Sequence, residues 1–280
     1  MQILNLVISM YRITNRQQVQ LDELKAHHLY GCSPIDWLKE SVEPFPKYRL
    51  GPAEEVWADK EDRYQPSHFS KKIGFSKIVT YYYKYQRNKG RTVDQRIYEK
   101  WEERYPFVKK VLEGDPQAWR MAVKKYGQFH RNPSLAKAYS LYVYSNIVEC
   151  DVYLHTLENV IPYQIEKVTK RGNLRYHIFP KMKRIELYEM YVYSCLNKVI
   201  IDLLAVLPCH TIFINGVYGD GYDVEPIISS VIERKKFQQY RCPKRTLQRH
   251  RLLVTFKKRS GFCVLNRVYS PRILYDKEDC

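Results

Sequence analysis

The fold is decided by residues 183–237, which begin with KRIELYEMYVYSCLNKVIIDLLAVL (183–207). Apolar residues recur there at helical spacing along one stripe, so the segment predicts a long amphipathic helix, and Pro208 ends it. The rest of the stretch has the composition of a strand, a turn and a strand: CHTIFINGV (209–217), GDGYD (219–223) and PIISSVIERKKF (226–237). The sequence therefore predicts a helix–strand–turn–strand unit.

Short strands are predicted on both sides of this unit. Before it, apolar and polar residues alternate in three segments that we expect to pair as antiparallel strands: DVYLHTL (151–157), PYQIEKVT (162–169) and NLRYHIF (173–179). After it, residues 240–280 are basic, with weak strand patterns at RLLVTF (251–256) and GFCVLNRV (261–268).

The chain before residue 150 predicts helices instead. Five prolines interrupt residues 1–75, so only short elements fit there. Three helices follow, each predicted from its own start signal to its own end: a capping box of Thr92 with Gln95 to Pro106, Asp115-Pro116 to Gly127, and Asn132-Pro133 to about Cys150.

These patterns together predict an α+β (mixed α/β) fold. A mainly helical N-terminal region, residues 1–150, precedes an α/β domain with a mixed sheet and a basic C-terminal segment, residues 151–280. An apolar content of 45% excludes a disordered chain, because such a chain lacks the apolar surface that offsets the entropy of ordering.

The chain of 280 residues has a net charge of +17, concentrated near its end. Residues 231–272 hold 13 Lys and Arg against one acid, Glu233, and so carry +12 of the total. A surface of this kind repels itself and attracts polyanions. Nucleic acid is therefore the expected partner, DNA in the first place, and a homodimer is compatible with the sequence. The cations expected to bind it in this segment are Lys236, Arg241, Lys244, Arg245, Arg249 and Arg251.

The cysteines and the apolar runs indicate a cytoplasmic protein. The seven cysteines are scattered, and no two have Cys-x-x-Cys spacing, so neither a zinc site nor a disulfide framework is predicted. The first residues, MQILNLVISMYRI, lack the basic start and the cleavage site of a signal peptide. The longest apolar run, 199–209, is too short to span a bilayer, so no membrane contact is expected. Asp202 lies inside this run and predicts a hydrogen-bonded core acid rather than a metal ligand.

The turn and strand at 219–237 contain the residue types of a metal-dependent nuclease. Such an enzyme holds Mg²⁺ with hard oxygen ligands and uses a lysine to orient or deprotonate the attacking water. Side chains alternate along a strand, so Glu233 and Lys235 would share a face, about 6–7 Å apart at the backbone. Asp223 in the turn would supply the second carboxylate.

The runs Gly219-Asp220-Gly221-Tyr222-Asp223-Val224 and Val231-Ile232-Glu233-Arg234-Lys235 resemble the active-site stretch of Mrr-type nucleases, of the restriction-endonuclease-like PD-(D/E)xK superfamily. The resemblance covers residues 186–237. It implies Mg²⁺-dependent phosphodiester hydrolysis, with Asp223 and Glu233 as metal ligands and Lys235 as the catalytic lysine. It also implies an acid on the preceding helix, and Glu189 suits that role better than Glu186 because it lies nearer the apolar stripe.

A second candidate site is VTYYYKYQRNKGR (79–91), where tyrosines alternate with cations. Aromatic rings that stack on bases beside cations that hold phosphates are typical of single-strand binding. An amphipathic element that buries its tyrosine rings is the alternative. The cations expected to bind here are Lys84, Arg87, Lys89 and Arg91.

The sequence leaves three functions open. The first is a Mg²⁺-dependent nuclease acting on DNA, in restriction, defence or a mobile element. The second is a non-enzymatic nucleic-acid-binding or assembly protein of phage or plasmid type, in which Gly-Asp-Gly is an ordinary hairpin turn and Glu186 and Glu189 complement the helix dipole. The third is a protein-interaction domain whose basic face meets an acidic partner.

Overall fold

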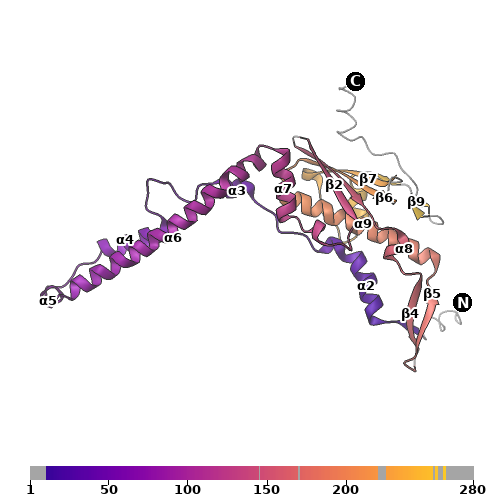
Figure 1. Ribbon diagram of the computed structural model, residues 1–280, viewed down its shortest axis with the longest axis horizontal. Helices are drawn as coiled ribbons and strands as arrows, with labels where there is room; N and C mark the ends of the chain where they lie inside the picture. The colour runs from indigo at the N-terminus through magenta and orange to yellow at the C-terminus, as the bar shows by residue number, and fades with distance from the viewer. Residues whose placement is uncertain are drawn as a thin grey trace, which may run out of the picture. The chain divides into compact units, whose positions relative to one another are not determined.

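The computed structural model describes residues 11–144, 146–169, 171–219, 225–254, 256–257 and 261–262. The chain forms two compact units, one of Met1–Ile35 with Gly114–Cys280 and one of Asp36–Glu113. Its helices and strands confirm the α+β class (Figure 1). The domain boundary predicted at residue 150 falls inside a strand, β3 (Ile147–Tyr153).

The first unit contains all of the strands that the structure describes. Its helices are α2 (Asn15–Ala26), α7 (Pro116–Tyr126), α8 (Leu157–Val160), α9 (Lys181–Val206) and α10 (Pro243–Gln248). Its strands are β1 (Tyr11–Ile13), β2 (Ala138–Tyr144), β3, β4 (Gln164–Thr169), β5 (Leu174–Ile178), β6 (Thr211–Tyr218), β7 (Glu225–Glu233), β8 (Arg251–Val254), β9 (Phe256–Lys257) and β10 (Gly261–Phe262).

A mixed five-stranded sheet in the order β2-β3-β6-β7-β8 is the centre of this unit. Its inner pair, β3 and β6, is parallel, and the other neighbours are antiparallel. Parallel neighbours need a crossover, and α9 supplies it before β6. A second, antiparallel sheet has the order β1-β4-β5, and Gly172, with φ of 83°, turns the chain between β4 and β5.

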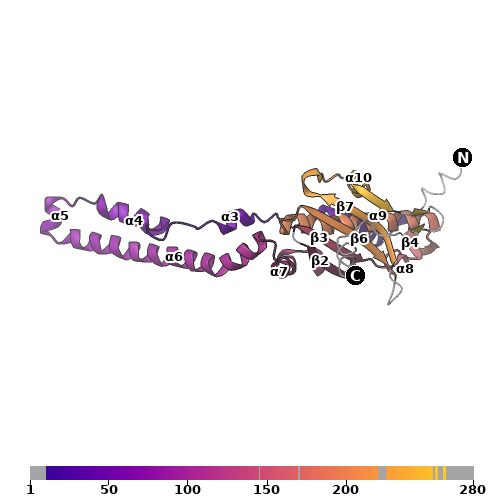
Figure 2. The ribbon, with the colours of Figure 1, turned by 90° about the horizontal axis from the view of Figure 1, so that it is seen from above.

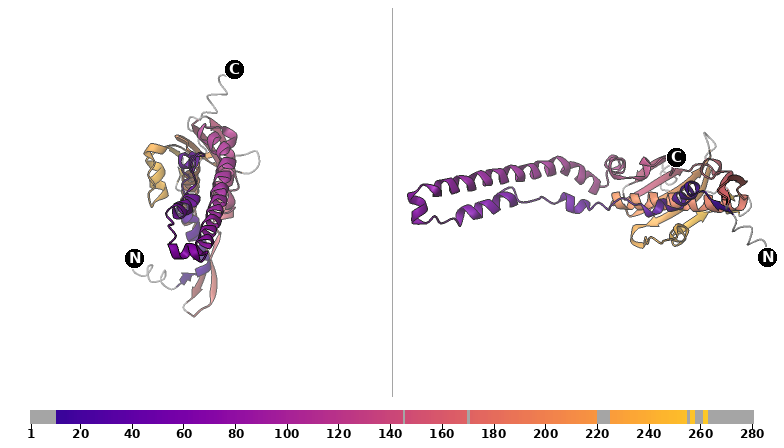
Figure 3. Two further views of the ribbon diagram at one scale, coloured as in Figure 1. Left: turned by 90° about the vertical axis from the view of Figure 1, so that its left-hand side faces the viewer. Right: turned by 90° about the horizontal axis from the view of Figure 1, so that it is seen from below.

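Helix α9 is the core of the unit. From Tyr191 to Val206 it is buried nearly all round, as expected of a helix packed on more than one side, and Figure 3 shows it beside the sheet strands. Gly216 on β6 lies where a side chain would collide with Ile228 and Leu154, since a Cβ there would be 2.5 and 3.2 Å from their nearest atoms. The absence of a side chain at this position lets the side chains of Ile228 and Leu154 pack over the β6 backbone.

The second unit is a helical hairpin. Its helices are α3 (Trp37–Ser41), α4 (Pro52–Asp62), α5 (His68–Lys72) and α6 (Phe75–Leu112). Helix α4 lies along α6 (Figure 2), and Gly90 permits their close approach, because a Cβ there would be 2.5 Å from the Ala53 carbonyl oxygen. The carboxylate of Asp94 caps α4 by accepting bonds from the amides of Ala53 (3.1 Å) and Glu54 (2.7 Å).

Several predicted elements are confirmed. Helix α7 begins at Pro116 with Asp115 as its N-cap, whose side chain accepts a bond from the Ala118 amide, and Gly127 is its C-cap. The long helix α9, the strand β6 and the strand β7 lie where the sequence placed a helix and two strands. The strands predicted at 162–169 and 173–179 are β4 and β5, and β8 falls within RLLVTF.

Two predicted helices are wrong. Thr92 starts no helix, because it lies inside α6 and its hydroxyl bonds the Asn88 carbonyl instead of capping; Pro106 also lies inside α6. Asn132-Pro133 starts no helix either, because the chain after it forms β2 and β3. These strands are rich in tyrosine and valine, which favour a sheet, and the pairing of β3 with β6 overrides the local start signal. In DVYLHTL, only the first residues belong to a strand, β3.

Candidate nucleic-acid interface

The structure does not place Glu233 and Lys235, the predicted catalytic pair, on one face of a strand. Strand β7 ends at Glu233, and Lys235 follows in a 3₁₀ turn, Arg234–Lys236. The expectation that a strand aligns these two side chains on one face is therefore wrong. Glu233 is exposed and forms an ion pair with Lys236 at 2.7 Å, and Lys235 is exposed beside it.

The structure also separates Glu189 from Glu233. In the β6–β7 ladder Glu233 pairs with Thr211, whereas Tyr218 lies at the opposite end, about 23 Å away at strand spacing. Tyr188, next to Glu189 on α9, contacts the ring of Tyr218 at 6.3 Å between centroids. Glu189 therefore lies by the Tyr218 end of the sheet.

The described residues do not gather metal ligands. Glu189 forms an ion pair with Lys244 at 2.7 Å, and Asp223 lies outside the described residues. Among the residues that the structure describes, no three His, Cys, Asp or Glu side chains are grouped to hold a metal ion. The described part of the site thus does not fit the Mg²⁺ set that the resemblance implies, and the roles of Asp223, Glu233 and Lys235 stay predictions.

Between residues 234 and 249, where the structure describes the side chains of the basic segment after β7, most cations have partners within the protein. Arg234 donates to the Cys209 carbonyl at 2.6 Å and to the Leu207 carbonyl, so it holds the loop between α9 and β6. Lys236 and Lys244 are in the ion pairs with Glu233 and Glu189. Arg245 and Arg249 lie over the ring of Tyr240 at 5.3 and 5.7 Å. Arg241 is exposed, and Arg251 lies on β8.

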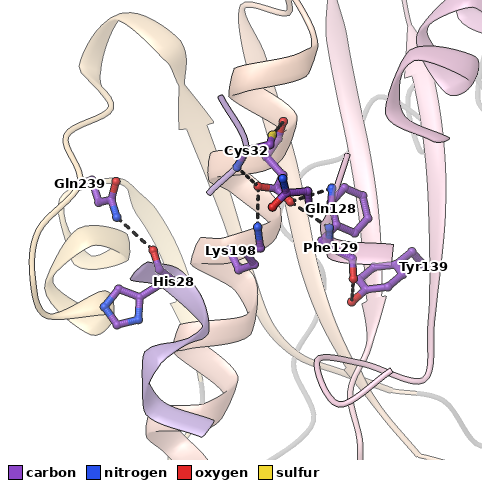
Figure 4. Close-up of polar contacts among 8 residues, drawn as sticks. His28, Cys32, Gln128, Phe129, Tyr139, Lys198 and Gln239 are labelled. Carbon is purple, nitrogen blue, oxygen red and sulfur yellow. Dashed lines mark hydrogen bonds and ion pairs between the residues drawn. The ribbon is translucent and has the colours of Figure 1, made fainter. Parts of the chain in front are cut away.

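The backbone that carries these cations is anchored to the first unit. Asn197 on α9 donates to the Pro243 carbonyl at 2.9 Å and so fixes the start of α10. Gln239 donates to the His28 carbonyl at 3.1 Å, as Figure 4 shows. The segment from 234 to 249 is therefore part of the folded unit, and its side chains serve partly to hold it there.

Asp202 is the hydrogen-bonded core acid that the sequence predicted. Its side chain is fully buried, and Lys198 donates to it at 2.8 Å. It also accepts bonds from the amides of Cys32 (3.0 Å), Gln128 (3.2 Å) and Phe129 (2.9 Å), which converge as in Figure 4. One carboxylate thus ties the N-terminal segment and the loop after α7 to α9. Burial and the nearby Asp202 raise the pKa of Cys32 to about 11, so this thiol is protonated and unreactive at neutral pH.

A second buried polar group was missed by sequence reasoning. Asn215 on β6 donates to Glu149 (3.1 Å) and Asp151 (2.8 Å) of β3, and accepts a bond from Ser229 of β7 (2.8 Å). All four side chains are buried. The alternation of acids in IVECDVY could have indicated it, since residues two apart share a strand face. These bonds fix the register of three neighbouring strands.

The tyrosine-rich segment lies on α6, and its tyrosines divide into two sets. Tyr82 and Tyr83 pack with Trp57 of α4 at 6.0 and 6.5 Å between ring centroids, and Tyr83 also contacts Tyr64 at 5.6 Å. Tyr82 and Tyr83 thus agree with the alternative interpretation of this segment, an amphipathic helix that packs its tyrosine rings against its neighbours. Arg87 belongs with them, because it forms ion pairs with Glu54 (3.2 Å) and Glu61 (3.4 Å).

Tyr81 and Tyr85 form the other set. They are 74% and 57% exposed, and neither ring contacts another ring in the part of the chain that the structure describes. On a helix they share a face with Lys77, Lys84 and Lys89. We call these five residues the exposed α6 face. Within the described residues none of its three lysines forms an ion pair.

In the stretch of sequence that contains this face, all charged residues are positive. From Arg63 to Val93 the sequence has eight cations and no acid: Arg63, Lys71, Lys72, Lys77, Lys84, Arg87, Lys89 and Arg91. Arg91 is exposed as well. Acids of α4 pair with two cations of this run: Glu54 and Glu61 with Arg87, and Asp59 with Arg63. The sequence indicated the tyrosine–cation alternation, but not which rings are free.

Comparisons with known proteins identify no relative. No family model matches the chain, and no curated protein or solved structure matches it either. Among the described residues, no helix is long and apolar enough to cross a membrane.

Proposed function

We propose that this chain is a non-enzymatic nucleic-acid-binding protein, acting on DNA in the first place, whose main contact surface is the exposed α6 face. The observation that carries the proposal is the run from Arg63 to Val93, which contains eight cations and no acid and in which the exposed rings of Tyr81 and Tyr85 contact no other ring among the described residues. Lysines without ion-pair partners are available to neutralise phosphates, and this neutralisation supplies most of the affinity of non-specific binding.

The two basic segments differ in how far their cations are engaged. In the segment after β7, Lys236, Lys244 and Arg234 already have carboxylate or carbonyl partners. On α6, Lys77, Lys84 and Lys89 have no ion-pair partner in the described part of the chain. A phosphate that binds α6 therefore displaces no intramolecular bond, which favours α6 as the principal surface and the later segment as a secondary one.

The combination of rings with cations favours nucleic acid over an acidic protein partner. Binding of an acidic protein needs only cations, whereas the bases of a nucleic acid can also stack on the rings of Tyr81 and Tyr85. Exposed aromatic rings are also unfavourable in water, so a surface that keeps them is typical of a binding site.

The proposal is tested by the salt dependence of DNA binding to the full chain. Replacing two lysines of the face, Lys84→Ala with Lys89→Ala, removes two phosphate contacts. The slope of log K against log salt concentration should then become shallower by roughly 1.4–1.8, since each contact contributes about 0.7–0.9. Fluorescence anisotropy of a labelled oligonucleotide, titrated at several salt concentrations, measures this slope.

A matched control lies on the same helix. Lys100→Ala with Lys110→Ala removes the same charge from α6, but outside the acid-free run: Lys100 lies beside Glu99 and Glu103, and Lys110 lies three residues before Glu113. This control should leave the slope within about half a unit of the unchanged protein. Equal effects of both pairs, or an affinity that does not depend on salt, would contradict the proposal. So would Mg²⁺-dependent cleavage that is lost in Asp223→Ala and Lys235→Ala, which would favour the nuclease instead.

A further inference from the structure

The exposed α6 face presents two rings in a regular ladder. Tyr81 and Tyr85 are four residues apart on one helix, so they lie on the same side and about 6 Å apart along the axis. Ile78 continues the ladder toward the start of α6 and is 65% exposed. The face therefore offers a short row of apolar surfaces, open to solvent in the described part of the chain.

Neighbouring tyrosines show that this exposure belongs to specific positions. Tyr82 and Tyr83 on the same helix find ring partners in Trp57 and Tyr64, so the hairpin has an aromatic cluster that is completed without Tyr81 and Tyr85. The two exposed rings are not needed to hold α4 on α6.

We infer that the exposed α6 face binds single-stranded nucleic acid, with unpaired bases stacked on Tyr81 and Tyr85 and phosphates held by Lys77, Lys84 and Lys89. This inference rests on the proposed function and specifies its ligand. Stacking needs an aromatic ring that is free on one side, and both rings meet this condition. The lysines flank the rings at helical spacing, so cations lie on both sides of a strand that follows the helix.

A duplex and a second copy of the chain fit the same face less well. In a duplex the faces of the bases are covered by their neighbours in the stack, so the rings could not reach them without unstacking. A second copy would bring the same acid-free run of cations against itself, and like charges would repel. A single strand alone offers both open base faces and negative charge.

The test compares three labelled ligands of equal length with the full chain: a 20-nucleotide thymidine strand, the same strand without bases at its central positions, and a duplex. Tyr81→Ala and Tyr85→Ala should each weaken binding of the intact strand by roughly 5- to 150-fold. Both variants should bind the base-free strand as the unchanged protein does, because that strand has nothing to stack. Tyr81→Phe and Tyr85→Phe keep the ring, so they should bind all ligands within about twofold.

Tyr176 provides the matched control, because it is 62% exposed on β5 of the other unit. Tyr176→Ala should leave all three affinities unchanged. The inference is overturned if the duplex binds as tightly as the intact strand, or if the alanine variants at Tyr81 and Tyr85 bind the intact strand normally. Failure of the proposed function has a different signature, namely no salt-dependent binding to any of the three ligands.

Discussion

Single buried residues hold the first unit together, and they are distinct from the proposed binding surface. Asp202 accepts bonds from three backbone amides in two segments besides its ion pair with Lys198, and His27 is buried near that pair. Losing one partner of a buried ion pair costs about 3–5 kcal/mol, because the other charge is left without compensation. At the residue scale, polar groups in this core therefore act on stability.

His27 makes the stability of the chain depend on pH. Burial, with the charges of His28 and Lys198, lowers the pKa of His27 to about 4. The residue is 9% exposed, and its Nε2 has no hydrogen-bond partner among the residues that the structure describes. Since the pKa is lower in the folded state than the ordinary 6.5, the unfolded chain binds more protons between these values. The stabilising effect is full above about pH 6.5 and is lost as the pH falls toward 4.

Because of the difference between the two pKa values, the free energy of unfolding should fall by about 2–3 kcal/mol across this pH window. Urea unfolding of the unchanged protein and of His27→Gln at pH 7.5 and 4.5 measures it. The variant should lose less stability than the unchanged protein on acidification, by about that amount. Parallel losses in the two proteins would show that His27 does not cause the acid sensitivity.

At the residue scale, the sequence predicted correctly those roles that depend only on neighbouring residues in the chain. Asp202 in an apolar helix and Asp115 before Pro116 follow from their immediate neighbours, and both roles are confirmed. The alignment of Glu233 with Lys235 needed the strand to continue past Glu233, and β7 ends there instead. Which tyrosines would be exposed depended on Trp57, a residue of another helix.

Helix α6 is the element on which the account depends. It continues through Thr92 and Pro106, which local rules assign to a start and an end. Its buried side packs against α4, and this packing lets the opposite side carry exposed rings and lysines. The extent of α6 and the strands β2 and β3 could not be predicted from short windows, because partners distant in the sequence determine them.

Asp94 determines whether α4 stays on α6. Asp94→Ala removes both bonds to the first amides of α4 and should destabilise that helix by about 1–2 kcal/mol. Hydrogen exchange of the α4 amides in the full chain should accelerate accordingly. Asp59→Ala is the control, because Asp59 is exposed on α4 and makes a single ion pair with Arg63. Unchanged protection of α4 in Asp94→Ala would show that the cap does not hold the hairpin.

At the scale of the whole molecule, the chain divides its tasks between two units. The first unit has the sheet, the buried helix α9 and a basic segment whose described cations, between residues 234 and 249, mostly have partners within the protein. The second is a helical hairpin whose long helix carries unpaired lysines and open rings within the described residues. The sequence predicted the α+β class, which is confirmed. It also predicted a nucleic-acid partner, which stays a prediction, and it placed the cations for that partner mainly after residue 231, where +12 of the charge lies, whereas the proposed surface lies on α6.

Ultraviolet cross-linking of the full chain to a single-stranded oligonucleotide containing 5-bromouracil, followed by mass spectrometry of the peptides, tests the central claim most directly. The account predicts adducts on the α6 peptide that contains Tyr81 and Tyr85, reduced by competition with unlabelled strand. Adducts confined to the segment from 234 to 249, with none on α6, would contradict it.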